Sequence, residues 1–579
     1  MTIIKNKYIK IVIFIMGFFF AFILKCENTK NDKNLFKKAP LNPKFIKYKK
    51  NKFKIKKQSI NGRKFGYFPS PVDNPLRHSN TYSKHSFPLV FDLRDSGKVT
   101  SIKDQGTFGT CWAFAALASI ESNYMPIENL DFSERALATN TGFDWVDMAE
   151  GNQYIATAVL SRWNGPVKEA YIPYSPNQTY NKEYIPQKHV QGVKFLPLRE
   201  NYLDNNTIKH FVQHNGGVAV SVLMSEEPPH FNSSSNSLYI NNSSLDTNHG
   251  VTIIGWDDNY SKNNFETTPP GNGAFLIKNS WGESWGNNGC FYVSYYDAVL
   301  SNPVSYNYTQ NTDNYGTMYM YDYLGWVSSY GYQNTIAWGA NIFTAINDQS
   351  LKAVSFFVTD ADVKFQIYIY QDITNNPTKG TLIAKKSGIL DYRGYHTIPL
   401  NSLVTLSKNQ KFSIVIKFEN NTYKYPIAVE YPEDDFSSLA EAETEQSYIS
   451  YNGNDWYDMD TDDANVNVCI RGLTEYIPIQ IDFDVNKIIA SSWTMKKEYV
   501  HITIDISNID EVSADTIILQ RKEEDGIFDH ILEVPISALD NGSYRFVDSN
   551  INKETAYIYR LIIKNTMGNV IGISEEKTI

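Results

Sequence analysis

Residues 105–114 read Gln105-Gly106-Thr107-Phe108-Gly109-Thr110-Cys111-Trp112-Ala113-Phe114. This stretch places a cysteine six residues after a glutamine, at the start of an apolar run that continues to Met125. Apolar side chains recur along the run at helical spacing, which predicts a helix that begins at the cysteine. The N-terminus of a helix stabilises a thiolate through its partial positive charge. The stretch therefore predicts a helix that presents a reactive thiol.

Two motifs far downstream supply the partners that such a thiol needs. They are His249-Gly250-Val251 and Lys278-Asn279-Ser280-Trp281-Gly282. A thiol, an imidazole and an amide in this order match a cysteine nucleophile, its base and the group that orients the base. In such an arrangement the imidazole also protonates the leaving amine.

Two more side chains complete the predicted site. The side-chain amide of Gln105, together with the backbone N–H of Cys111, can form an oxyanion hole for a tetrahedral intermediate. Trp281 stands two residues after Asn279 and can cover the hydrogen bond between the amide and the imidazole, which keeps water away. We therefore expect Gln105, Cys111, His249 and Asn279 to act together as the catalytic residues.

The segments between these motifs predict the fold class. Four apolar runs indicate buried strands, at residues 218–222, 251–255, 273–278 and 290–294. Because the helix comes first and the strands follow, we expect an α+β domain that ends near residue 300.

The stretch from Phe87 to about Leu300 resembles the papain-like cysteine peptidases through four separated motifs in the family's order. The motifs are Phe91–Gln105, Asp131–Glu134, Gly217–Val220 and Asn279–Gly286. The resemblance implies a two-lobed α+β peptidase domain, expected here over residues 86–300. It also implies the roles of the site residues: Gln105 is the oxyanion glutamine, Cys111 the nucleophile, His249 the base and Asn279 the orienting residue.

The chain departs from the family pattern at the cleft. Phe108 stands where many members carry a cysteine of a structural disulfide, so that bridge is not expected. The cysteine- and glycine-rich segment that lines the cleft in many relatives is missing, and Glu150-Gly151-Asn152 occupies roughly its place. We take Gly151 and Trp281 as the candidates for substrate binding.

The first 25 residues predict a secretory signal peptide. Three lysines precede the apolar run Ile11–Leu24, which is short for a membrane span and typical of a signal. An uncleaved anchor helix is one alternative, and lipidation of Cys26 is another. We expect the protein to be secreted or held at the cell surface, with a membrane involved only through the signal or a lipid anchor.

Residues 26–85 predict a basic prosegment or linker, so the enzyme is expected to be made as a zymogen. The segment is rich in lysine and asparagine, and five prolines break any long helix. Its positive charge suits an acidic surface such as the enzyme's own cleft, and a solvated tether is the alternative. The long helical pattern of prosegments in plant and animal relatives is missing, so self-inhibition by that route is not expected.

Residues 301–474 predict a β-sandwich, because short alternating runs recur at residues 363–369 and 412–418. The segment resembles the lectin-like domain that follows the peptidase in some bacterial and archaeal surface proteases, through Ser447–Asp458 and Asn467–Gly472. A sugar site there would use Trp456, Tyr451 and Asp455. The alternative is that these aromatic residues belong to the core of the sandwich.

Residues 475–579 predict a second all-β sandwich that resembles a fibronectin type III module, through residues 544–549 and 557–561. Calcium is a candidate ligand of the lectin-like domain, and a solvated loop is the alternative reading of its acidic residues. These residues are Asp434, Asp435, Asp460, Asp462 and Asp463. Catalysis itself is expected to need no cofactor and no metal.

Composition narrows the function further. The formal net charge is -9 at pH 7, which argues against a nucleic-acid partner. The chain has only four cysteines, far apart, so neither a disulfide scaffold nor a metal cluster is expected. The sequence predicts a cysteine endopeptidase that hydrolyses protein or peptide substrates through an acyl-enzyme, with a cell-surface or glycan ligand as a further partner. The alternatives are a surface adhesin that uses the peptidase domain as a scaffold, and a transferase that uses the same acyl-enzyme.

Overall fold

The computed structural model describes residues 36–51, 59–60, 62–73, 86–145, 147–175, 186–226, 229–461, 464–475, 480–491, 496–507, 514–524, 528–539, 542–552, 555–565 and 570–579. None of the helices within these ranges is both long enough and apolar enough to cross a membrane. The expected signal peptide, Cys26 and the pair Asp462 and Asp463 lie outside the described residues.

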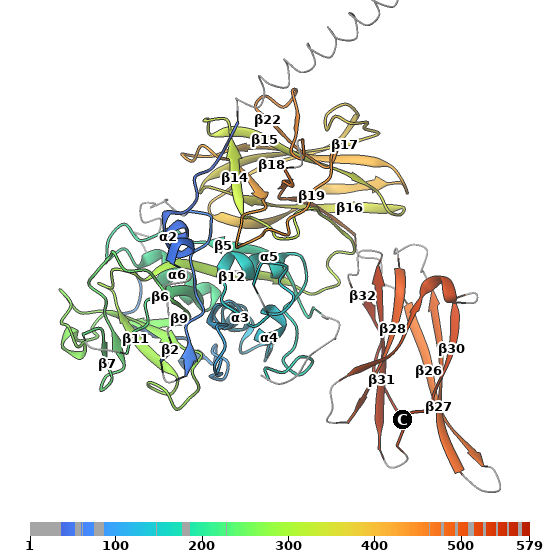
Figure 1. Ribbon diagram of the computed structural model, residues 1–579, viewed down its shortest axis with the longest axis horizontal. Coiled ribbons are helices and arrows are strands. Elements are labelled where there is room, and N and C mark those ends of the chain that lie inside the picture. The colour runs from blue at the N-terminus through green and yellow to red at the C-terminus, as the bar shows by residue number, and fades with distance from the viewer. Residues whose placement is uncertain are drawn as a thin grey trace, which may run out of the picture.

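The peptidase module consists of a helical lobe and a strand lobe, each with its own apolar core. Its elements are β4 (Val90–Asp92), η1 (Leu93–Ser96), α3 (Cys111–Tyr124), α4 (Glu134–Leu137), α5 (Gln153–Ser161), β5 (His189–Phe195), α6 (Asn206–Asn215), β6 (Val218–Val222), β7 (Phe231–Asn232), β8 (Ser237–Leu238), β9 (His249–Asp257), η2 (Lys262–Asn264), β10 (Ala274–Lys278), β11 (Cys290–Ser294) and β12 (Ser301–Gln310). Figure 1 shows α3 beside β9, the strand against which it packs.

Helix α3 begins at Cys111, as the sequence predicts, and is apolar on nearly all sides. A helix of that kind must be buried, and α3 packs along β9 and β12. Close approach to β9 depends on Gly250, because a Cβ there would lie 3.1 Å from the Cα of Trp112. This packing brings the first residue of α3 next to the first residues of β9.

The peptidase module extends further than the sequence indicates. Strand β12 follows the expected boundary at residue 300, yet it pairs antiparallel with both β5 and β6. The module therefore continues to the end of β12, and the expected boundary is about ten residues too early. Residues 301–310 therefore pair within the peptidase module and not within the sandwich that follows.

The lectin-like module is a sandwich whose strands alternate between buried and exposed side chains. Along β17, for example, Val363, Phe365, Ile367 and Ile369 face the core and the residues between them face outward, as the pleat of a half-buried strand requires. Its strands are β13 (Met318–Tyr319), β14 (Ser328–Gly331), β15 (Ile336–Thr344), β16 (Gln349–Val358), β17 (Val363–Gln371), β18 (Thr381–Leu390), β19 (Arg393–Leu406), β20 (Lys411–Glu419), β21 (Ile427–Glu430), β22 (Ser447–Ser450), β23 (Tyr457–Asp458), β24 (Asn467–Val468) and β25 (Ile470–Thr474).

The peptidase and lectin-like modules share one continuous sheet. Strand β19 of the lectin-like module pairs antiparallel with β5 of the peptidase module, with Arg393 opposite Phe195. A fully buried ion pair lies near this junction: Arg471 binds Asp322 through Nε and Nη2, at 3.0 and 2.8 Å, and also donates to the Ser161 carbonyl of α5 at 2.8 Å. The two modules are joined through backbone pairing and buried charge, not only through their linker.

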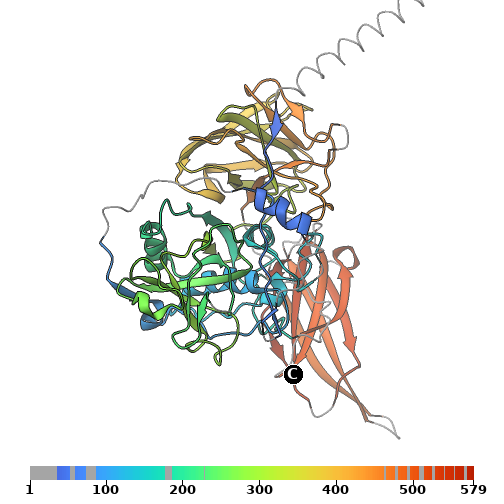
Figure 2. The same ribbon diagram turned by 60° about the vertical axis from the view of Figure 1, so that its left-hand side comes forward.

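The prosegment lies against both modules. Its described elements are β1 (Lys37–Lys38), α2 (Pro43–Asn51), β2 (Ser59–Ile60) and β3 (Arg63–Lys64). Strand β1 pairs with β14 of the lectin-like module, and Figure 2 shows α2 at the junction of the two modules. Lys38 and Lys49 both form ion pairs with Glu433. The described part of the segment is therefore bound to the enzyme and is not a solvated tether.

The C-terminal module is an all-β sandwich of two sheets, drawn in orange and red in Figure 1. Its elements are β26 (Gln480–Ser491), β27 (Lys496–Ser507), β28 (Ala514–Glu523), β29 (Asp529–Pro535), η4 (Ile536–Ala538), β30 (Ser543–Asp548), β31 (Tyr557–Asn565), β32 (Val570–Ile573) and β33 (Lys577–Thr578). Apolar residues from both sheets form its core. The two-sandwich architecture expected after the peptidase is confirmed, and the likeness to fibronectin type III stays a prediction.

Candidate active site

The predicted thiol and imidazole meet at the contact between α3 and β9. Cys111 opens α3, His249 opens β9, and both side chains are fully buried. The backbone N–H of Gly250 donates to Cys111 Sγ at 3.2 Å. Residues that are far apart in the sequence are thus brought together by the packing of one helix on one strand.

The imidazole of His249 is oriented by Asn279. Its Nε2 lies 2.8 Å from Asn279 Oδ1, while its Nδ1 has no hydrogen-bond partner among the described residues. The indole of Trp281 covers this pair, with its ring centroid 4.9 Å from that of the imidazole. Because Nε2 is engaged, Nδ1 is the ring nitrogen left to exchange a proton with the thiol.

The side-chain amide of Gln105 is held in one orientation by two donors. Its Oε1 accepts from Ser280 Oγ at 2.8 Å and from Trp281 Nε1 at 3.2 Å. Its Nε2 is therefore the end that faces the cleft, where it donates to the carbonyl of Lys64 at 3.0 Å and to that of Phe108 at 2.7 Å. Sequence reasoning missed the role of Ser280, although its place directly after Asn279 was a usable signal.

A strand of the prosegment runs through the cleft between its two walls. Gly151 donates to the Gly66 carbonyl at 2.8 Å and accepts from the Phe68 N–H at 3.3 Å. On the other wall, the Asn248 carbonyl accepts from the Tyr67 N–H at 3.0 Å. The predicted binding residue Gly151 therefore lies where it can bind a peptide backbone on both sides.

The prosegment passes very close to the nucleophile, and this needs a glycine. A Cβ on Gly66 would lie 1.8 Å from the carbonyl oxygen of Gly109, so no other residue fits without a backbone shift. The Gly66 carbonyl is turned to Gly151 and not to Gln105. The prosegment carbonyl that does reach the Gln105 amide is that of Lys64, two residues before Gly66.

Burial changes the protonation of both the Cys111 thiol and the His249 imidazole. Desolvation raises the pKa of the Cys111 thiol to about 12, against smaller opposing effects of backbone N–H groups, first that of Gly250. Desolvation also lowers the pKa of His249 to about 4, with the hydrogen bond to Asn279 acting in the opposite direction. Near neutral pH both groups are therefore uncharged in this closed state.

The second predicted binding residue, Trp281, has its indole fully buried. Its backbone carbonyl accepts from Arg63 Nη2 of the prosegment at 2.9 Å, and the ring of Phe65 lies 6.0 Å from both the Trp281 and the His249 rings. Trp281 therefore contacts the prosegment through its carbonyl and its ring face, while its N–H is used to hold Gln105.

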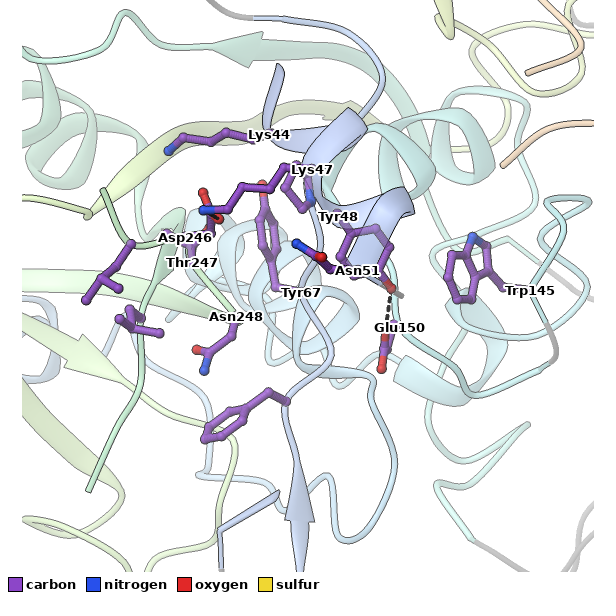
Figure 3. Close-up of a pocket in the computed structure, with 14 residues that line it drawn as sticks. Lys44, Lys47, Tyr48, Asn51, Tyr67, Trp145, Glu150, Asp246, Thr247 and Asn248 are labelled. Carbon is purple, nitrogen blue, oxygen red and sulfur yellow. Dashed lines mark hydrogen bonds and ion pairs between the residues drawn. The ribbon is translucent and has the colours of Figure 1, made fainter. Parts of the chain in front are cut away.

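Helix α2 covers a cavity of about 440 Å³ beside the cleft (Figure 3). The hydroxyl group of Tyr48, in α2, donates to Glu150 Oε2 at 2.8 Å. Lys47, also in α2, forms an ion pair with Asp246 at 2.6 Å. The prosegment thus contacts acidic residues on both walls, through a hydroxyl group at Glu150 and through a positive charge at Asp246.

The lectin-like module carries candidate residues for a sugar site and for a calcium site. Tyr451 is 44% exposed and donates to Asp455 Oδ2 at 3.1 Å, whereas Trp456 is partly buried and donates to Thr378. Within the described ranges, no group of three or more His, Cys, Asp or Glu residues could hold a metal ion. The three cysteines in these ranges, Cys111, Cys290 and Cys469, are free.

Comparison with known proteins agrees with this geometry. Residues 87–307 match the family model described as papain family cysteine protease, and residues 318–474 match the model described as lectin like domain. A viral cathepsin of Heliothis zea nuclear polyhedrosis virus is 34% identical over 209 residues, which cover 35% of this chain and 51% of that protein. A viral cathepsin of Lymantria dispar multicapsid nuclear polyhedrosis virus is 31% identical over 212 residues, which cover 36% of this chain and 54% of that protein. The chain spans about half the length of these curated relatives.

Solved structures match a larger part of the chain. The cysteine protease and lectin-like domains of Cwp84, a surface layer associated protein of Clostridium difficile, are 26% identical with a TM-score of 0.64. That match covers 76% of this chain and 98% of the other. The structure of Cwp84 after propeptide cleavage is 28% identical with a TM-score of 0.60, and covers 67% of this chain and 99% of the other.

Proposed function

Because the chain carries a papain family cysteine protease domain at residues 87–307 and a lectin-like domain at residues 318–474, we propose that it is a cysteine endopeptidase kept latent by its own prosegment. The observation that carries the proposal is the assembly of Cys111, His249, Asn279 and Gln105 around a peptide strand that already lies in the cleft.

The chemistry assigns one role to each of these groups. The Cys111 thiolate attacks the substrate carbonyl carbon, and the oxyanion accepts from Gln105 Nε2 and the Cys111 backbone N–H. His249 takes the thiol proton and gives it to the leaving amine, and Asn279 keeps the ring in position. Water, deprotonated by His249, then hydrolyses the acyl-enzyme. No cofactor takes part in this route.

The prosegment keeps the enzyme inactive until it is removed. It fills the cleft, engages the Gln105 amide, and desolvates the thiol and the imidazole. The route differs from inhibition by a long helical prodomain, since the described helix α2 has only 9 residues and the cleft itself is filled by an extended strand.

The lectin-like module is proposed to hold the enzyme at the cell surface, as a secreted protein. Cwp84 is described as surface layer associated, and it has a cysteine protease domain and a lectin-like domain, as this chain does. A glycan bound near Tyr451, Asp455 and Trp456 is the proposed ligand, because exposed aromatic and acidic side chains can meet a sugar ring and its hydroxyls. Calcium in this module stays a prediction from its acidic residues.

The test compares the wild-type chain with Cys111→Ala, both produced from residue 26 onward. The readouts are N-terminal trimming and digestion of casein in the presence of a reductant. We expect wild type to digest casein after trimming, and the variant to be folded and inactive. A trimmed, folded wild-type protein that neither digests casein nor reacts with a thiol-directed electrophile would contradict the peptidase function and favour a binding protein.

A further inference from the structure

We propose that the cleft carries a pocket that selects tyrosine in the substrate, at the second residue on the amino side of the scissile bond, and that Gln153 is the residue that sets this selection. The inference rests on the proposed peptidase function and names its substrate class. In the closed state this pocket holds the side chain of the prosegment residue Tyr67.

Tyr67 is anchored more completely than a packing contact requires. Its side chain and backbone are 9% exposed, and its phenol donates to Gln153 Oε1 at 2.6 Å. Gln153 is the first residue of α5, and its own carbonyl accepts from Tyr306 Oη at 3.1 Å. The phenol also lies near Ser221, which is fully buried. The pocket therefore encloses the Tyr67 side chain and presents a hydrogen-bond acceptor at its end.

The backbone of Tyr67 shows where this pocket lies relative to the nucleophile. Gly66 passes over Cys111 and bonds Gly151, while the Tyr67 N–H bonds the Asn248 carbonyl. Tyr67 is thus the first residue beyond the nucleophile whose side chain enters the wall of the cleft. The wall that binds this stretch needs a glycine at position 151, since a Cβ there would lie 2.4 Å from the Trp112 ring.

The chemistry decides which half of a substrate uses this pocket. The leaving amine receives its proton from His249, so the carboxyl half of the substrate lies on the side where the His249 and Trp281 rings meet. In the closed state Phe65 occupies that side, with its ring 6.0 Å from each. The amino half of the substrate, which forms the acyl-enzyme, therefore lies on the Gly151 side, where Tyr67 is bound. The prosegment thus runs through the cleft in the direction opposite to that of a substrate.

The acceptor at the end of the pocket explains why tyrosine is preferred over phenylalanine. A phenylalanine side chain fills the same volume but leaves Gln153 Oε1 without its donor. Sites that hydrogen-bond a substrate hydroxyl discriminate strongly against the analogue that lacks it, because a desolvated polar group is left unpaired. A pocket with apolar walls alone would distinguish the two side chains weakly.

The first experiment needs no variant. The trimmed wild-type enzyme is assayed with peptides that differ only at the second residue on the amino side of the scissile bond, which is Tyr, Phe or Val. We expect kcat/KM for the Tyr peptide to exceed that for the Phe peptide by about tenfold or more. Equal values, or a faster Phe peptide, would overturn the inference.

The second experiment assigns the selection to Gln153. Gln153→Met keeps the length of the side chain and removes the acceptor, whereas Gln153→Glu keeps an acceptor. We expect the Tyr-to-Phe ratio to fall towards one in the first variant and to be retained in the second. An unchanged ratio in Gln153→Met, in a protein with wild-type thermal unfolding, would overturn the role of Gln153.

A third measurement tests the pocket without turnover of a Tyr substrate. A synthetic peptide of residues 62–72 should inhibit casein digestion, and its Tyr67→Phe version should need about tenfold higher concentration. Equal inhibition by the two peptides would contradict the proposal. Casein digestion separates the two levels of the argument: its absence contradicts the peptidase function, whereas casein digestion without Tyr selection contradicts only the pocket.

Discussion

The carbonyl oxygen of Lys64 accepts a 3.0 Å hydrogen bond from the side-chain amide of Gln105. The same amide is the donor that an oxyanion would need, so one bond both binds the prosegment and engages part of the catalytic apparatus. Ser280 and Trp281 hold the other end of this amide, which fixes its direction before any substrate arrives. In the mechanism that we propose, latency thus uses the catalytic groups themselves.

Thiol labelling should report removal of the prosegment. The closed state raises the pKa of Cys111 to about 12, so the thiolate fraction at pH 7 falls and alkylation slows. We expect iodoacetamide to modify Cys111 about tenfold or more faster after trimming than in the full chain, as measured by mass spectrometry. The buried Cys290 and Cys469 serve as internal controls and should stay unmodified in both forms. Equal rates for Cys111 would contradict desolvation by the prosegment.

Gly66→Ala should weaken latency. The added methyl group would lie 1.8 Å from the Gly109 carbonyl oxygen, so the strand must move away from the nucleophile. We expect faster trimming of the full chain, followed by gel electrophoresis over time. Gly62→Asn is the matched control, because nothing lies within 4 Å of a Cβ at Gly62 and asparagine tolerates its positive φ of 83°. Trimming of Gly66→Ala at the wild-type rate would argue against this close contact.

Gln105→Ala should lower kcat more than it changes KM. Loss of one preorganised oxyanion donor costs about 10²–10³ in kcat, since the donor acts on charge that develops in the transition state. Kinetics of the trimmed enzyme on a peptide substrate measure both constants. Gln366→Ala, on an exposed position of β17, should leave both constants at wild-type values. A purely structural role of Gln105 would instead reduce the amount of folded enzyme without this split.

Arg471→Met should destabilise the joined modules. It leaves Asp322 as a buried carboxylate without its partner, which typically costs about 3–5 kcal/mol. The thermal unfolding transition of the full chain is expected to shift to lower temperature. The double variant Arg471→Met with Asp322→Leu removes both charges and should recover most of the loss. A double variant as unstable as the single one would mean that the bond from Arg471 to Ser161 matters more than the charge pair.

Some expectations failed for a physical reason that concerns long-range pairing. Residues 301–310 were expected to belong to the following sandwich, but they form β12, which pairs with β5 and β6 of the peptidase module. The same limit applies to β19, whose pairing with β5 unites two modules. Register between distant segments depends on complementary faces in three dimensions, which no local pattern encodes.

The sequence by itself determined the identity and order of the groups that we propose to react. Cys111 before an apolar helix, His249 before a buried strand and Asn279 before Trp281 are local patterns, and each has a direct chemical meaning. Only the tertiary structure decided what lies between the walls of the cleft. That Gly66 and Tyr67 lie between Gly151 and Asn248 depends on backbone hydrogen bonds between segments that are distant in the chain. Such bonds need only backbone groups, which every residue carries, so they leave almost no mark on the sequence.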